Sequence, residues 1–233
     1  VYAGETLVLI GLSGCGKTTL LRMMNRLVDA DRGEIVIEGI SSRQWDPISL
    51  RRKTGYVIQD VGLLPHYTIG DNVGLVPRLK GWAEKDVART VEEMMTMVNL
   101  NPARFKDRYP HELSGGQKQR VGVARALAGD PDIVLMDEPF GALDPITRDE
   151  LQDEFLKLEG TLKKTILFVT HDIFEAVKMG NRIGIMKEGA IEQIGTPEEI
   201  LDSPASDFVS RFLGKHREYL QSWVADSRKS GAH

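Results

Sequence analysis

Apolar and polar positions divide the chain into stretches with different periods. Three short apolar runs have the length and continuity of buried strands in a parallel sheet. They cover residues 6–10, 133–136 and 165–170. Residues 32–39 alternate apolar and polar side chains between glycines, which predicts a half-exposed strand, and residues 54–59 predict another. Residues 182–186 and 190–194 predict a hairpin that turns at 187–189.

Helical patterns occupy the middle of the chain. Strand signals vanish between Asp60 and about residue 130, where prolines and glycines first break the chain into loops and short helices. Residues 83–100 then place apolar side chains at helical spacing, and we interpret them as a core face rather than a Met-rich binding groove. We therefore expect a helical subdomain at about 61–130, inserted into an α/β core at about 1–60 and 131–213.

Two later stretches, 151–162 and 174–179, also have helical spacing. From Lys215 onward the chain is polar and charged, which predicts a final helix with a loose end. We assign about 214–233 to a polar C-terminal tail.

A glycine-rich loop follows the first apolar run and precedes a helical stretch. It matches G-x-x-x-x-G-K-[ST] at each position, the spacing of a P-loop. Glycines let backbone N–H groups converge on a triphosphate, and the following helix N-terminus favours an anion. We expect Lys17 to reach the β- and γ-phosphates and the Thr18 hydroxyl to bind Mg²⁺. The residues expected to contact ATP are Gly11, Leu12, Ser13, Gly14, Cys15, Gly16, Lys17, Thr18 and Thr19.

Polar side chains follow three of the predicted strands. Asp137 ends one of them, where strand ends meet at the ligand crevice of an α/β sheet, and we expect it to hold Mg²⁺ directly or through water. Glu138 is then placed to orient or deprotonate the attacking water. His171 ends the next apolar strand and would donate to the γ-phosphate, and Gln59 would contact Mg²⁺ and the water. The alternatives are a solvated acidic loop at 137–138 and structural roles for the other two residues.

A second anion site is predicted on the inserted subdomain. Ser114 is a favourable N-cap, and Gly115 and Gly116 open the helix that continues through Gln117. A capped helix start with no ligand is the structural alternative. One explanation for two phosphate-binding helix ends in one chain is that the second end serves the nucleotide of another copy.

Composition narrows the class of protein. The chain has 233 residues, 41% hydrophobic and 27% charged, with a formal net charge of -4. It contains no apolar run of about 18 residues and shows no signal-peptide pattern. The mild acidity argues against nucleic acid as the main partner. Cys15 is the single cysteine, so no internal disulfide is expected, and no histidine lies nearby in sequence to activate its thiol.

Taken in order, these motifs resemble the nucleotide-binding subunit of ABC transporters over nearly the whole chain. Gly11–Thr18 resembles Walker A, Leu113–Gln117 the ABC signature and Ile133–Asp137 Walker B. The resemblance makes Gln59 the Q-loop glutamine, Glu138 the catalytic base, Asp144 part of the D-loop and His171 the switch histidine. It implies an α/β P-loop ATPase with a mixed sheet core and an inserted helical subdomain, and it implies ATP and Mg²⁺ as cofactors.

The resemblance also implies partners. Two copies would form a head-to-tail homodimer, with ATP held between Walker A of one copy and Ser114, Gly115, Gly116 and Gln117 of the other. Asp144 would couple the two sites. A surface near residues 60–82 would receive transmembrane permease subunits, a substrate-binding protein would act indirectly, and the chain would lie peripherally on the cytoplasmic face of the inner membrane.

Longer stretches are similar to the ATPases of bacterial osmoprotectant importers for glycine betaine, choline, carnitine or proline betaine. They are 23–27, 55–69, 108–110 and 137–148. The same ATPase class with a different solute is an alternative, because this subunit does not touch the solute. A soluble ABC ATPase acting on DNA or ribosomes would typically carry coiled-coil insertions or tandem cassettes, and the sequence has neither.

Residues 1–233 do not predict two features found among osmoprotectant importer ATPases, an adenine-stacking aromatic residue and a pair of regulatory domains. Family members carry an aromatic residue upstream of Walker A that stacks on adenine, and Tyr2 is too close to the loop for this role. Many osmoprotectant relatives also continue into paired regulatory CBS domains, so sensing through such domains is not implied here.

Overall fold

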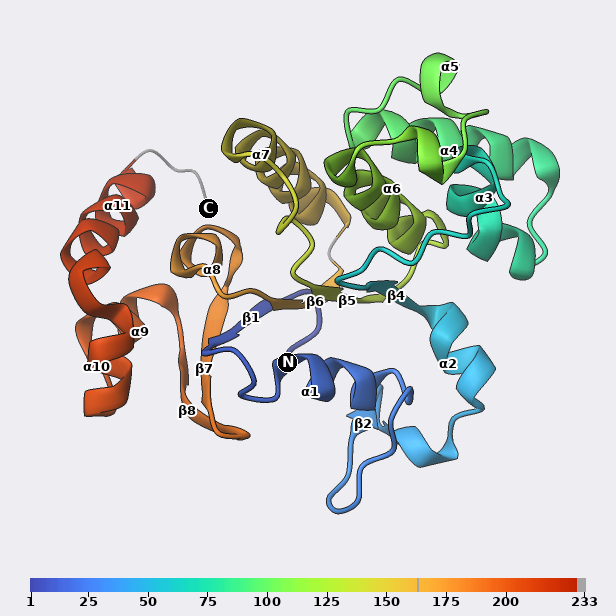
Figure 1. The fold of residues 1–233 in the computed structure, drawn as a ribbon. Helices are drawn as coiled ribbons and strands as arrows, with labels where there is room; N and C mark the ends of the chain where they lie inside the picture. The colour runs from blue at the N-terminus through green and yellow to red at the C-terminus, as the bar shows by residue number, and fades with distance from the viewer. Residues whose placement is uncertain (163, 230–233) are drawn as a thin grey trace.

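The computed structural model describes residues 1–162 and 164–229. Its centre is a mixed sheet with the strand order β4-β5-β6-β1-β7-β8 (Figure 1). Neighbouring strands pair in parallel except β7 and β8, which are antiparallel. In chain order the strands are β1 (Thr6–Gly11), β4 (Thr54–Val57), β5 (Ile133–Asp137), β6 (Thr165–Val169), β7 (Arg182–Lys187) and β8 (Ala190–Gly195). The expected α/β class with a mixed sheet is confirmed.

The apolar runs lack alternation because both faces of the central strands are covered. Val8 and Ile10 pack into the core on one face of β1, whereas Leu7 and Leu9 pack into a second apolar cluster on the other face. Helices α7 (Pro145–Leu162) and α8 (Ile173–Met179) lie above the sheet in Figure 1, and α1 (Lys17–Met24) lies below it.

A group of helices stands beside β4, at the right of Figure 1. Its members are α3 (Ile69–Leu79), α4 (Glu84–Met97), α5 (Pro102–Phe105) and α6 (Gly115–Ala128). Helices α3, α4 and α6 pack against one another. The predicted core face of α4 is confirmed, because Val87, Val91 and Met95 are buried.

The predicted strand over 32–39 is wrong in extent. The structure has β2 (Val36–Ile37) and β3 (Ile40–Ser41), which form a separate two-stranded sheet. Glu38 and Gly39 both have positive φ and turn the chain between them, which ends the strand early. The sequence also did not predict α2 (Pro47–Lys53), whose start is capped by Asp46 accepting from the Ser49 amide at 2.8 Å.

The C-terminal part adds three helices beside β7 and β8, at the left of Figure 1. They are α9 (Pro197–Asp202), α10 (Asp207–Leu213) and α11 (Arg217–Lys229). The expected final helix is present as α11, and Leu220 and Val224 on it are buried. The end of the predicted tail, 230–233, lies outside the described residues. No helix within the described residues is long and apolar enough to cross a membrane.

Candidate nucleotide-binding site

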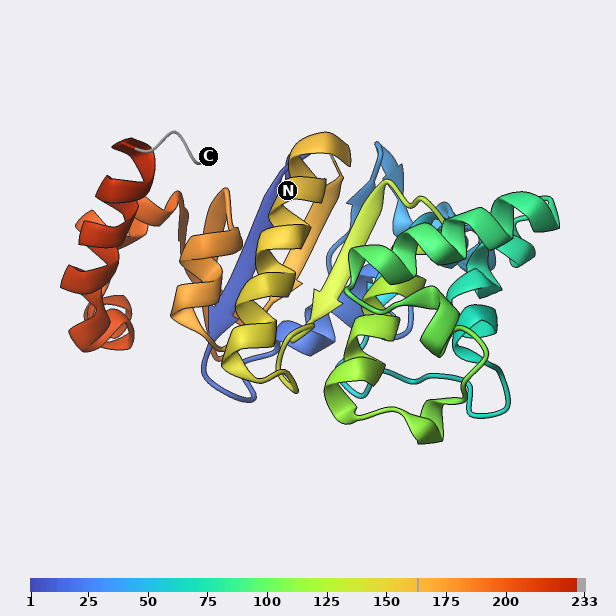
Figure 2. The ribbon, with the colours of Figure 1, turned by 90° about the horizontal axis from the view of Figure 1, so that it is seen from above.

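The candidate site lies at one edge of the sheet. Strands β4, β5, β6 and β1 are consecutive neighbours and run parallel, so their carboxyl ends meet at the same edge. In Figure 2 the arrows of β1 and β5 point to this same side. The chain segments that leave this edge carry Gln59, Glu138, His171 and the loop Gly11–Thr18. The sheet therefore gathers residues that are more than 100 positions apart in the sequence.

The glycine loop is tightly built into the fold. A Cβ added to Gly11 would lie 2.3 Å from the Met186 carbonyl oxygen of β7, so only glycine fits there. Gly16 has φ +102 and forms the N-cap of α1 without any side-chain cap. The first N–H groups of α1 consequently have no side-chain acceptor from the cap residue and are free to face an anion.

Lys17 stands at the first position of α1, where its residue is only 7% exposed. Its Nζ donates to the carbonyl oxygens of Gly11 at 2.8 Å and Leu12 at 3.2 Å, and it lies 3.6 Å from Cys15 Sγ. No carboxylate among the described residues pairs with it. A buried ammonium with only neutral partners is electrostatically suited to an incoming anion.

Thr18 and Asp137 meet next to this loop. Thr18 Oγ1 donates to Asp137 Oδ1 at 3.1 Å. Asp137 is 2% exposed, and burial raises the pKa of its carboxyl, with the hydrogen bond from Thr18 opposing that rise. A hydroxyl and a carboxylate side by side are hard oxygen ligands, so these two residues fit a divalent cation such as Mg²⁺. Gln59 follows β4 by two residues and its side chain is exposed.

Glu138 adopts a left-handed backbone conformation with φ +49. Its amide donates to the Val169 carbonyl at 2.9 Å, which ties it to the end of β6. Its Oε1 lies 3.2 Å from Nδ1 of His171, whose side chain is 68% exposed. The structure thus brings two of the three predicted catalytic residues, Glu138 and His171, into direct contact, with the His171 ring facing solvent.

The second predicted anion site is a capped helix start. Ser114 Oγ accepts from the Gln117 amide at 3.3 Å, and Gln117 Oε1 accepts from the Ser114 amide at 3.0 Å. No hydrogen bond or ion pair between described residues joins 114–117 to the loop 11–18. A Cβ added to Gly115 would meet nothing within 4 Å, so the fold of the described chain itself does not require glycine there.

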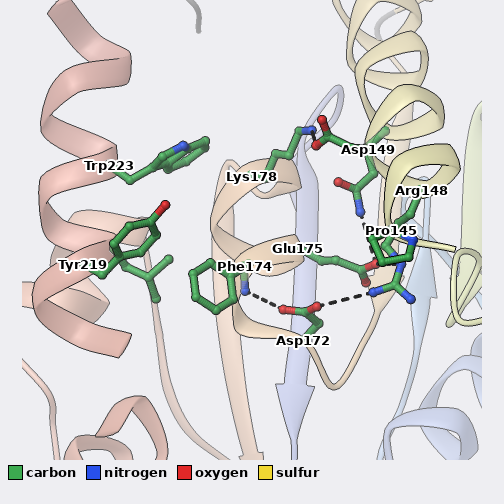
Figure 3. Close-up of a pocket in the computed structure, with 11 residues that line it drawn as sticks. Pro145, Arg148, Asp149, Asp172, Phe174, Glu175, Lys178, Tyr219 and Trp223 are labelled. Atoms are coloured by element: carbon green, nitrogen blue, oxygen red, sulfur yellow. Dashed lines mark hydrogen bonds and ion pairs between the residues drawn. The ribbon is translucent and has the colours of Figure 1, made fainter. Parts of the chain in front are cut away.

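The loop that carries His171 is anchored by a network of half-buried and buried groups, part of which Figure 3 shows. Asp172 pairs with Arg148 at 3.7 Å and accepts from the Phe174 amide at 2.8 Å. Glu175 accepts from Thr170 Oγ1 at 2.6 Å, and burial raises the pKa of Glu175. Arg148, Asp172 and Glu175 line one side of a cavity of about 290 Å³ between α7, α8 and α11.

Sequence reasoning missed Gln119. This glutamine is 3% exposed on α6 and bonds to both Glu138 and Ala142 through its side-chain amide. The sequence signal that could have identified Gln119 was a polar residue on the apolar side of a predicted helix, two positions after Gln117. That signal alone did not identify the partners, because they lie on a different element.

The loop, the buried lysine, the hydroxyl–carboxylate pair and the sheet edge that unites them define a P-loop nucleotide-binding domain with an inserted group of helices. The ABC transporter family model matches residues 1–141. The chain belongs to the ABC transporter family.

Relatives in this family are similar over most of the chain. The Bacillus subtilis glycine betaine/carnitine/choline transport ATP-binding protein OpuCA is 56% identical over 93% of this chain. The Salmonella typhimurium osmoprotectant import ATP-binding protein OsmV is 50% identical over 93%, and the Escherichia coli glycine betaine uptake system ATP-binding protein YehX is 48% identical over 91%. The chain spans 57% of the length of OpuCA and OsmV and 68% of YehX.

A solved structure supports the same fold. The dimeric post-hydrolysis state of the ATP-binding cassette MJ0796, bound to ADP and Pi, superimposes with a TM-score of 0.78 at 36% identity. The match covers 84% of this chain and 87% of that one. The similarity therefore extends beyond the P-loop core.

Proposed function

We propose that this chain is the ATP-hydrolysing subunit of an importer for a small quaternary amine. The observation that carries the ATP-hydrolysing part of the proposal is the contact of Glu138 with His171 beside the Thr18–Asp137 pair and the buried Lys17. A base, a donor, a cation site and an anion site are the groups that phosphoryl transfer to water requires.

ATP would bind with its β- and γ-phosphates in the loop from Gly11 to Thr19. Lys17 would exchange its two carbonyl partners for phosphate oxygens, which are stronger acceptors because they are charged. The backbone N–H groups at the start of α1 would add further donors.

Thr18 and Asp137 would hold Mg²⁺, with Gln59 approaching from the end of β4. When bound, the ion would neutralise charge on the phosphate oxygens. Asp137 must be ionised for this role. Burial raises the pKa of its carboxyl, so the buried carboxylate is costly while unpaired, and a bound cation would offset that cost by stabilising the ionised form.

Glu138 would accept a proton from the attacking water, and His171 would donate to the γ-phosphate. Their 3.2 Å contact keeps the carboxylate oriented at the sheet edge before nucleotide arrives. General-base assistance of this kind contributes about 10²–10⁴-fold to a rate.

The second helix start would complete the site of another copy. Gly115 has open space where a side chain would stand, which leaves room for a phosphate to approach the α6 N-terminus. The dimeric state of the similar cassette MJ0796 supports a dimer for this chain. In a head-to-tail pair, Ser114–Gln117 would contact the partner's nucleotide, and Asp144, whose pKa is lowered by hydrogen bonds from Thr147, would lie between the two sites.

Permease subunits would dock on the surface near residues 60–82. Leu64, Tyr67 and Leu79 are exposed apolar side chains on this stretch. Arg125 donates to the carbonyls of Val61 at 2.6 Å and Gly62 at 2.8 Å, which fixes the segment after Gln59 to α6. Docking here would place the chain peripherally on the cytoplasmic face of the membrane, with the substrate-binding protein acting through the permease.

The solute class rests on the relatives. OpuCA, OsmV and YehX are named for glycine betaine, choline, carnitine or osmoprotectants, and a Pelagibacter ubique trimethylamine N-oxide transport ATP-binding protein is 48% identical. Methylated amines are common to most of these names. The alternative is that the transported solute is a different small methylated amine. Competition of that amine with labelled glycine betaine or choline for uptake would separate the two possibilities.

The test uses the chain assembled with its permease and binding protein in vesicles. Wild type should hydrolyse ATP and accumulate labelled glycine betaine or choline. Glu138→Gln should bind ATP with unchanged affinity but hydrolyse it at least about 100-fold more slowly. Retained turnover in this variant would reject Glu138 as the base, and uptake of neither amine would reject the solute class.

A further inference from the structure

The side chain of Gln119 forms two hydrogen bonds with the loop that follows β5. Its Nε2 donates to the Glu138 carbonyl at 2.8 Å, and its Oε1 accepts from the Ala142 amide at 2.8 Å. The residue is 3% exposed, so water does not replace these bonds readily. One side chain of α6 therefore holds both ends of the loop 138–142.

The loop needs such support because Glu138 has a disfavoured conformation. Its φ of +49 is uncommon for a residue with a side chain, and such conformations persist only where neighbours fix them. The Glu138 carbonyl also accepts from Gly141 at 3.2 Å, so the loop closes on itself and onto Gln119. The direction of the Glu138 carboxylate depends on this arrangement.

A second contact joins the start of α6 to the same loop. A Cβ added to Gly116 would lie 3.0 Å from Leu143 Cδ2 and 3.6 Å from the Ala142 carbonyl oxygen. The first turn of α6 thus packs directly on residues 142–143. A displacement of the first turn of α6 would therefore also displace residues 142–143, because close-packed interiors transmit strain.

We propose that Gln119 is a positioning residue that couples the two nucleotide sites of the dimer. The inference rests on the proposed function, in which Ser114–Gln117 contact the nucleotide of the partner subunit. The same helix, less than two turns further on, fixes Glu138 of its own chain. Nucleotide held at the α6 start therefore sets the orientation of the base in the other site, and hydrolysis becomes cooperative in ATP.

The test compares Gln119→Met and Gln119→Glu with wild type in the assembled transporter. Methionine keeps the length of the side chain and removes both hydrogen bonds. Glutamate keeps an acceptor for the Ala142 amide but loses the donor to the Glu138 carbonyl. Gln193→Met is the matched control, because Gln193 likewise donates to Ser203 at 2.9 Å and accepts from Ala205 at 2.8 Å, away from the sheet edge.

Both Gln119 variants should lower kcat by about 100-fold, since small misplacement of a catalytic group has effects of that order. KM for ATP should change by less than about threefold, and the Hill coefficient should fall toward one. Gln193→Met should keep the wild-type kcat and Hill coefficient. Hydrogen exchange at the Ala142 amide should accelerate in Gln119→Met and stay slow in Gln119→Glu.

An unchanged kcat and Hill coefficient in Gln119→Met and Gln119→Glu would overturn the coupling role, even if Ala142 exchange accelerates. If Gln119→Met fails to fold, Gln119→Glu decides the question alone. A wild-type protein that hydrolyses no ATP would instead reject the proposed function, so the two failures are distinguishable.

Discussion

The left-handed conformation of Glu138 predicts that the wild-type residue reduces the stability of the fold. A residue with a Cβ in this conformation costs about 1–2 kcal/mol, and asparagine tolerates it better than glutamate. Glu138→Asn should therefore relieve backbone strain while removing the proposed base. The protein would become more stable and lose ATP hydrolysis.

The magnitude follows from three contributions. Relief of strain contributes about 1 kcal/mol. Burial raises the pKa of Asp137, and the nearby Glu138 charge raises it further, so removal of that charge favours the folded protein at neutral pH. Loss of the Glu138–His171 pair opposes these effects, but the His171 side chain is 68% exposed and such pairs contribute about 0–1 kcal/mol. The expected gain of about 1 kcal/mol corresponds to a Tm increase of about 2–4 °C.

A matched control lies in the β7–β8 turn. Glu188 has the same φ of +49, is exposed and precedes Gly189, so Glu188→Asn creates the Asn-Gly pair that two-residue hairpins favour. This substitution changes no side chain of the candidate site and keeps the Gly189 amide that donates to the Cys15 carbonyl at 3.0 Å, so ATP hydrolysis should stay at the wild-type rate.

The assay is urea unfolding together with ATP turnover for wild type and both variants. We expect both asparagine variants to have higher free energies of unfolding, and Glu138→Asn alone to lose turnover by about 10²–10⁴-fold. If Glu188→Asn is stabilised and Glu138→Asn is not, the strain argument for the catalytic loop is wrong. If Glu138→Asn retains turnover, its proposed role as the base is wrong.

Three further predictions concern separate parts of the site. Lys17→Ala should abolish ATP binding in an equilibrium binding assay, and wild-type affinity would contradict its phosphate role. Ser114→Ala should lower the free energy of unfolding by about 1 kcal/mol through the lost N-cap, and in a Glu138→Gln background it should weaken the ATP-dependent dimer in sedimentation. Burial raises the pKa of Glu175 above its ordinary value of 4.5. The free energy of unfolding of wild type should therefore fall relative to that of Glu175→Gln as the pH rises from the ordinary pKa through the raised one. Denaturation of both proteins across that pH range measures this, and a difference between them that does not change with pH would refute it.

Local patterns determined most of what the sequence predicted. The P-loop, the apolar strands on both sides of it and the Ser114 cap depend on residues that are neighbours in the chain, so spacing alone reveals them. The short strands β2 and β3 escaped the pattern because two positive-φ residues turn the chain where alternation continues. Helix α2 escaped because its Asp46 cap was not recognised.

Only the tertiary structure decided how distant residues meet. The contact between Glu138 and His171 depends on the register of β5 with β6, in which Asp137 lies opposite Val169. Gln119 reaches Glu138 and Ala142 because α6 packs beside the end of β5, and no spacing in the sequence specifies that approach. The physical reason is that sheet register and helix packing are set by burial of the whole core, whereas a loop that binds phosphate is set by its own glycines.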